Sequence, residues 1–89
     1  SPRQLIAEQI EPQVVEVFDE THGQLAEFVE KHRQLAERVE TSGETAFFYC
    51  REPRQLLAQL ADADGLRYVH RASNLEDVFI KLTGRELRD

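Results

Sequence analysis

The side chains best suited to catalysis or metal binding are three histidines and one cysteine, and they are scattered along the chain. His22, His32 and His70 fall on different expected elements, and no two of them have the spacing of paired metal ligands, such as His-x-x-x-His. Cys50 has no histidine beside it and only Arg51 as a basic neighbour, whereas a nucleophilic cysteine needs a base or positive surroundings. The sequence therefore predicts no metal site and no catalytic residue, and it predicts a buried thiol at Cys50.

The glycines do not form a phosphate-binding loop. They stand alone at Gly23, Gly43, Gly65 and Gly84, whereas nucleotide-binding loops need several glycines within a few residues. Their positions fit helix ends and turns instead. We therefore expect this chain to bind no nucleotide and no other cofactor.

Three consecutive aromatic residues, 47–49, raise the alternative of a sheet on which bases stack, as in RNA-recognition domains. The charge argues against it, because the formal net charge is -6 and Glu44 stands where a basic residue would be needed. Nucleic acids and anionic membrane surfaces both attract basic faces. Neither is an expected partner, and the aromatic residues are assigned to a core or an interface.

Length and composition indicate one small domain. The chain has 89 residues, 31% of them charged, and it contains no apolar run near the roughly 20 residues that cross a bilayer. A single cysteine cannot form an internal disulfide, which fits a reducing cytoplasm.

The most strongly marked element is a short helix expected over residues 73–84. Ser73 suits the N-cap, Glu76 three residues later completes a capping box, and Gly84 can end the helix. The apolar residues recur at i, i+3, i+4 and i+7, which predicts a single apolar stripe. The candidate interaction or packing motif on this helix comprises Leu75, Glu76, Asp77, Val78, Phe79 and Leu82.

The rest of the pattern predicts an α+β fold. Apolar alternation marks strands, and apolar residues at helical spacing mark helices. Strands are expected at residues 13–19, 37–41, 45–50 and 66–71, and helices at residues 1–10, 21–35, 53–64 and 73–84. The order after Pro12 is βαββαβ with an additional C-terminal helix, which is the ferredoxin-like pattern with an antiparallel sheet, preceded by a short N-terminal helix.

The two faces of this sheet are expected to differ. Right-handed crossovers place the first and third strands in the middle, and these two strands are apolar on both faces. Two helices cover only one face, so we expect the final helix to cover the other, with Phe79 and Leu82 largely buried. The residues expected on that other face are Val14, Phe18, Ala46, Phe48 and Cys50, or their neighbours.

The end of the chain carries a resemblance to a known family. Residues 75–80 read LEDVFI and residues 82–85 read LTGR. Together they resemble the C-terminal signature of ATPase subunits of ABC-2-type bacterial exporters. The tail at residues 86–89, ELRD, is most similar to the nodulation-factor-exporter branch of that family.

The head and middle of the chain are similar to the same family. Residues 1–5 resemble the short helix that closes the nucleotide-binding domain, and the stretches at 38–40, 42–45 and 65–68 also agree. The resemblance therefore spans nearly the whole chain. It implies that residues 1–12 form a linker helix from the preceding ATPase domain and that residues 13–89 form a C-terminal accessory domain.

The resemblance also implies a function. The longer protein would bind and hydrolyse ATP on the cytoplasmic side of the bacterial membrane and drive export through a separate permease. This domain would not itself be an enzyme, and it would pair ATPase subunits or couple them to the permease. The implied partners are the parent ATPase domain, a second ATPase subunit and the permease, which would hold the domain at the inner face of the membrane. A homodimer of the domain is left open.

A second class of function also remains open. Small-ligand-sensing regulatory modules share the ferredoxin-like fold, although this analogy rests on the fold alone. A thermal-shift screen separates the two, because a specific ligand raises the melting temperature by mass action.

Overall fold

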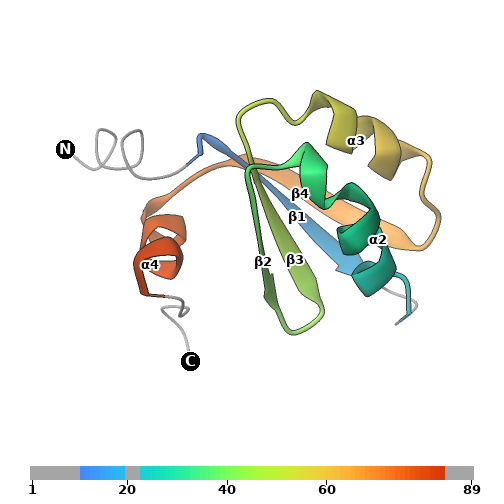
Figure 1. Ribbon diagram of the computed structural model, residues 1–89, viewed down its shortest axis with the longest axis horizontal. Coiled ribbons are helices and arrows are strands. Elements are labelled where there is room, and N and C mark those ends of the chain that lie inside the picture. The colour runs from blue at the N-terminus through green and yellow to red at the C-terminus, as the bar shows by residue number, and fades with distance from the viewer. Residues whose placement is uncertain (1–10, 20–22, 84–89) are drawn as a thin grey trace.

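The computed structural model describes residues 11–19 and 23–83, which form one four-stranded sheet and its helices (Figure 1). The four expected strands and the last helix are confirmed to within about two residues at each end, whereas the second and third helices end three residues earlier than expected. The expected N-terminal helix, the residues on which the second helix was expected to begin, and Gly84 lie outside the described residues. In chain order the elements are β1 (Gln13–Asp19), α2 (Leu25–His32), the 3₁₀ turn η1 (Arg33–Leu35), β2 (Arg38–Ser42), β3 (Thr45–Cys50), α3 (Arg54–Ala61), β4 (Leu66–Ala72) and α4 (Leu75–Thr83).

The sheet has the strand order β2-β3-β1-β4, and all three strand pairs are antiparallel. The first and third strands are therefore central, as the sequence predicted. The polar strands β2 and β4 lie at the two edges, where their outward backbone groups have no strand neighbour within the described part of the chain. Charged side chains on edge strands are a common protection against unwanted pairing.

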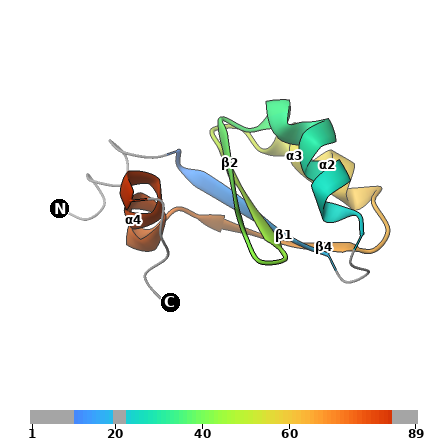
Figure 2. The ribbon, with the colours of Figure 1, turned by 60° about the horizontal axis from the view of Figure 1, so that its bottom comes forward.

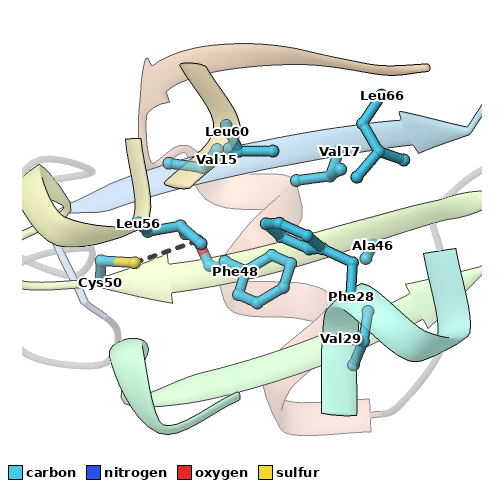
Figure 3. Close-up of a cluster of buried hydrophobic side chains, with 10 residues drawn as sticks. All are labelled: Val15, Val17, Phe28, Val29, Ala46, Phe48, Cys50, Leu56, Leu60 and Leu66. Carbon is cyan, nitrogen blue, oxygen red and sulfur yellow. Dashed lines mark hydrogen bonds between the residues drawn. The ribbon is translucent and has the colours of Figure 1, made fainter. Parts of the chain in front are cut away.

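The helices α2 and α3 cover one face of this sheet, and the core lies beneath them (Figures 1 and 2). Figure 3 shows the side chains of this core, in which the rings of Phe28 and Phe48 meet edge to face at 6.1 Å between centroids. Aromatic pairs prefer this geometry. The core comprises Val15, Val17, Phe28, Val29, Ala46, Phe48, Cys50, Leu56, Leu60 and Leu66.

The expected division of residues between the two faces was partly wrong. Ala46, Phe48 and Cys50 lie in the core beneath the helices rather than on the opposite face. The reason is the register, because β1 and β3 pair Val15 with Phe48, and residues directly opposite each other point to the same side of a sheet. The face away from α2 and α3, called the open face below, instead carries Val14 and Phe18 with Phe47 and Tyr49.

The helix α2 begins at Leu25 because a carboxylate caps it from the preceding strand. Asp19 Oδ2 accepts hydrogen bonds from the backbone N–H groups of Gly23, Gln24 and Leu25, at 2.9, 2.7 and 2.9 Å. These are the groups that a helix start leaves without partners. The carboxylate at the end of β1 therefore sets where α2 starts.

A two-residue turn connects β2 to β3. Ser42 pairs with Thr45, so that Gly43 and Glu44 form the turn, and Gly43 has φ = 62°. Glycine reaches this left-handed region at little cost in free energy.

No helix in the described ranges is long and apolar enough to cross a lipid bilayer.

Candidate interaction surface

The helix α4 begins with a capping box formed by Asn74 and Asp77. The backbone N–H of Asn74 donates to Asp77 Oδ2 at 2.7 Å, and the backbone N–H of Asp77 donates to Asn74 Oδ1 at 3.1 Å. The expected box of Ser73 and Glu76 was therefore wrong by one residue. Both pairs have the spacing of a capping box, and the sequence does not distinguish between them.

Ser73 is not the cap because it still belongs to the sheet. Its backbone N–H donates to the carbonyl oxygen of Pro12 at 3.0 Å, and its hydroxyl donates to the carbonyl oxygen of Glu11. These bonds continue the pairing of β1 with β4 by one residue beyond Ala72. The helix can therefore start only after Ser73.

Asp77 also joins α4 to the sheet through an arginine on β4. Arg71 Nη1 donates to Asp77 Oδ2 at 2.8 Å, and Arg71 Nη2 donates to Asp77 Oδ1 at 2.9 Å, while Arg71 Nε donates to Glu16. Two parallel bonds between a guanidinium and a carboxylate are stronger and more directional than one. The carboxylate is only 1% exposed, and its hydrogen bond is the main cause of the raised pKa of Arg71. Arg71 therefore remains charged.

The same carboxylate meets the hydroxyl of Tyr49 on the open face. Tyr49 is fully buried, and its hydroxyl lies 3.4 Å from Asp77 Oδ1, a long hydrogen bond. Burial raises the pKa of Tyr49, and the negative charge of Asp77 raises it further, so the phenol keeps its proton and can donate it. The guanidinium of Arg38 lies 3.8 Å above the centre of this ring, in a cation–π contact.

Three apolar residues of α4 face outward. Leu75, Phe79 and Leu82 are 46%, 37% and 64% exposed, and their spacing of four and three residues places them on one side of the helix. We call these three residues the α4 stripe. Asp77 lies two residues from both Leu75 and Phe79, which places it on the opposite side, at about 100° per residue. The buried side of α4 carries Asp77, Val78 and Ile80.

The expectation that Phe79 and Leu82 are largely buried was therefore wrong. Only two residues separate β4 from α4, and the helix lies on the side of the sheet away from α2 and α3 (Figure 3). There Asp77 contacts Tyr49 and Arg71. Because the side of the helix with Asp77 faces the sheet, the α4 stripe on the opposite side turns away from it. Of the six motif residues, Asp77 and Val78 are buried, Glu76 is half-buried, and the α4 stripe is exposed.

The residues considered first for chemistry do not converge. His32 stacks beside Phe28 at 4.2 Å between ring centroids, His70 Nε2 lies 2.6 Å from Gln13 Oε1, and His22 is outside the described residues. Within residues 11–19 and 23–83, no three His, Cys, Asp or Glu side chains are grouped so that they could hold a metal ion.

Cys50 is a buried thiol, as expected. It is fully buried, and its Sγ lies 3.7 Å from the carbonyl oxygen of Phe48 (Figure 3). Burial is the main cause that raises its pKa, to about 11, and the charges of Glu37 and Glu11 act in the same direction. The thiol is therefore protonated and weakly nucleophilic near neutral pH.

A hollow with a volume of about 530 Å³ lies between the start of α2 and the β2–β3 turn. Its charged groups are Asp19 and Glu44. The carboxylate of Asp19 already accepts three backbone hydrogen bonds. The hollow therefore lacks the set of converging polar groups that is typical of a small-molecule site.

Sequence reasoning missed Arg71, Tyr49 and Asn74 as the partners of Asp77. Asn74 is as good an N-cap as Ser73, so its role depends on where β4 ends. Tyr49 lies on β3 and Arg71 on β4, the two strands on either side of β1, and both residues pair with Val14. That shared partner is visible only once the strand order is known.

Comparison with known proteins identifies the family. A profile of the "Nodulation factor export protein NodI, C-terminal domain" matches residues 25–84. The chain is 53% identical to the "Nod factor export ATP-binding protein I" of Cupriavidus pinatubonensis, covering 99% of this chain and 26% of that protein. It is 52% identical to the protein of that name from Cupriavidus metallidurans, covering 99% of this chain and 28% of the relative.

A more distant relative has the same name. The Rhizobium meliloti protein is 44% identical over 99% of this chain and 25% of its own length. The chain thus spans about a quarter of the length of these relatives, and no solved structure matches it significantly. The match to a C-terminal domain supports the expectation that this chain is not itself an enzyme. The resemblance expected from residues 75–89 is confirmed, and the chain belongs to the family of C-terminal domains of the nodulation factor export protein NodI.

Proposed function

We propose that this domain is the non-catalytic C-terminal part of an ABC exporter's ATP-binding subunit and that it works by contact, in subunit pairing or in coupling the subunit to its permease. The names of its relatives support the first half of this proposal. The single observation that supports a role in contact is the α4 stripe, because three large apolar side chains on one short helix face outward. Such groups on a protein surface often mark a contact site.

The manner in which α4 is held supports the same function. The bonds of the buried Asp77 carboxylate to Arg71 and to the N–H of Asn74 fix the first turn of the helix. A surface that is already ordered loses less conformational entropy when a partner binds. The stripe is therefore suited to contact, since its helix does not have to form on binding.

The sheet fits the ferredoxin-like class, which we assign on the order βαββαβ and on the central positions of β1 and β3. The additional helix α4 lies outside that pattern. We further propose that the domain acts on the cytoplasmic side of the membrane, next to the permease, and that it does not bind nucleic acid. The net charge of -6 is unfavourable for nucleic acid as a partner.

The test uses the complete ATP-binding subunit together with its permease. Serine replaces all three stripe residues in one variant, Leu75→Ser/Phe79→Ser/Leu82→Ser. The control variant is Tyr68→Ser/Val69→Ser, which removes two apolar side chains of β4 that are also exposed. Co-purification of the permease and of a second, differently tagged subunit is measured, together with ATP hydrolysis by the isolated subunit.

The stripe variant should lose at least one of the two partners while its ATP hydrolysis in isolation persists. The control variant should keep both partners. Full retention of both partners by the stripe variant would contradict a role of α4 in assembly with either partner. An equal loss in both variants would mean that general surface polarity, rather than the α4 stripe, decides assembly.

A further inference from the structure

The chain enters the domain directly beside the start of α4. Ser73 holds the backbone of Glu11 and Pro12 through its hydroxyl and its N–H group. Gln13, the first residue of β1, pairs with Ala72, the last residue of β4. Both views show α4 next to the start of β1 (Figures 1 and 2). Any part of the protein attached before Glu11 therefore begins next to α4.

In the relatives, most of the protein precedes this domain. The chain matches a C-terminal domain and covers only 26% and 28% of the two Cupriavidus proteins. A body that is covalently attached before Glu11 stays near α4, so its effective concentration there exceeds that of a separate molecule.

The α4 stripe is small for a contact between separate molecules. The helix has nine residues, which corresponds to a length of about 13.5 Å, and only three apolar side chains form the stripe. A stable interface between separate proteins buries about 1,600 Å² in total. A surface as small as the stripe is better matched to a partner that a covalent connection already holds close.

Charge also favours an attached partner. Two copies of this domain would each have a net charge of -6 and would repel each other, most strongly at low salt. The inner leaflet of a membrane is anionic and would repel the domain as well. An apolar contact with the preceding part of the same polypeptide needs no opposite charge, because the connection itself overcomes the repulsion.

We propose that Leu75, Phe79 and Leu82 dock on the ATP-binding part of the same polypeptide, close to the point where the chain leaves it. This inference rests on the proposed function, in which that part precedes the domain. It names the preceding ATP-binding part, rather than a second subunit or the permease, as the occupant of the α4 stripe. The permease or the second subunit then contacts another surface of this domain. The docked stripe holds that surface in place, so loss of the stripe still weakens assembly.

The experiment places a photo-reactive benzoyl group at Leu82 in the complete subunit. The matched control has the same group at Tyr68, which is 42% exposed and lies on β4. Both proteins are illuminated alone and also in membranes with the permease. Gel mobility separates adducts within one polypeptide from adducts between two, and mass spectrometry of the digested adduct locates the partner residue.

The expected result is an adduct from Leu82 to the ATP-binding part, with the mobility of a single polypeptide, at least five times more abundant than any adduct from Tyr68. The additional change Phe79→Ser should abolish it. An adduct that joins two subunits, or one that joins subunit and permease, would overturn the inference and leave the proposed function standing. The absence of an adduct above the level of the Tyr68 control would overturn the inference as well.

Discussion

Arg71 and Asp77 face each other across the junction of β4 and α4, joined by two hydrogen bonds of 2.8 and 2.9 Å. The two residues are six positions apart in the chain, yet one belongs to the sheet and the other to the first turn of the helix. Because both bonds must form at once, they fix the direction in which α4 leaves the sheet. That direction decides which side of the helix is buried and which side carries the α4 stripe.

The capping box predicts different effects at two neighbouring acidic residues. Asp77→Ala should lower the free energy of unfolding by about 3–5 kcal/mol, because it leaves the partly buried guanidinium of Arg71 without its main partner and removes the cap of α4. Glu76→Ala should change it by less than about 0.5 kcal/mol, as is usual for a residue outside such a network. Urea denaturation of both variants measures the difference.

The outcome also distinguishes the two capping boxes. If Ser73 and Glu76 formed the cap instead, Glu76→Ala would be the more harmful substitution. A conservative change, Asp77→Asn, keeps the shape and one acceptor but loses the charge. It should therefore fall between the wild type and Asp77→Ala.

The exposure of the α4 stripe predicts that one phenylalanine is nearly neutral for stability. Phe79→Ala should lower the free energy of unfolding by less than about 1 kcal/mol, because the side chain is already in contact with water. The matched change in the core, Phe48→Ala, should cost about 3–5 kcal/mol, because it empties a fully buried site. Thermal melts of the two variants check this. A large loss of stability in Phe79→Ala would mean that the stripe packs within the domain.

The candidate surface was found from the sequence only in part. The spacing of Leu75, Val78, Phe79 and Leu82 predicted a single apolar side of one helix. Three of these four residues share the exposed side, whereas Val78 is buried. Periodicity alone does not say whether such a side packs inward or faces out. The answer depended on Arg71, whose contact with Asp77 arises from the strand order and not from any local pattern.

The buried thiol predicts a loss of stability in alkaline solution. Burial raises the pKa of Cys50 to about 11, whereas the thiol of an unfolded chain has a pKa near roughly 8.5. The folded state therefore keeps its proton over a range in which the unfolded chain releases it. Stability is unaffected by this group below about pH 8.5 and decreases as the pH rises towards 11.

Comparison with Cys50→Ala isolates this contribution, because all other titrating groups are shared. The variant should be less stable at pH 8, since it leaves a small cavity, but its denaturation midpoint should fall less steeply between pH 9 and pH 11. The raised pKa of Tyr49 adds a decrease above roughly pH 10, and this decrease is the same in both proteins. Parallel pH profiles for the two proteins would rule out the role of the thiol.

The β2–β3 turn predicts a backbone effect at Gly43. Its φ of 62° disfavours a β-branched side chain, although an added Cβ would meet no atom within 4 Å. Gly43→Val should therefore lower the free energy of unfolding by about 1–2 kcal/mol through backbone strain alone. Gly43→Asn should lower it by less, because asparagine tolerates this region. Equal losses for the two variants, measured in urea, would point to the side chain rather than to the backbone.

The fold was more predictable than the surface. Apolar alternation located all four strands, and the handedness of crossovers correctly placed β1 and β3 in the middle. The assignment of Phe48 to a face of the sheet failed. Apolar alternation tells which residues of one strand share a side, but not which side of the neighbouring strand lies on the same face of the sheet. The pairing of Val15 with Phe48 relates the two patterns, and a shift of one residue would have reversed the result.

The central position of β1 bears on the order in which the chain folds. Both of its neighbours come later in the sequence, and the contact of Gln13 with His70 joins residues 57 positions apart. Closing so long a loop lowers the conformational entropy of the chain before the contacts between β1 and β4 can form. The β2–β3 hairpin, in contrast, needs only a two-residue turn. We expect φ-values near one in the hairpin, for example at Ala46, and near zero at Val69. The strand β1, although it comes first in this domain, would then pair with β4 only late in folding. The helix α4 would reach its final position only when β4 joins the sheet.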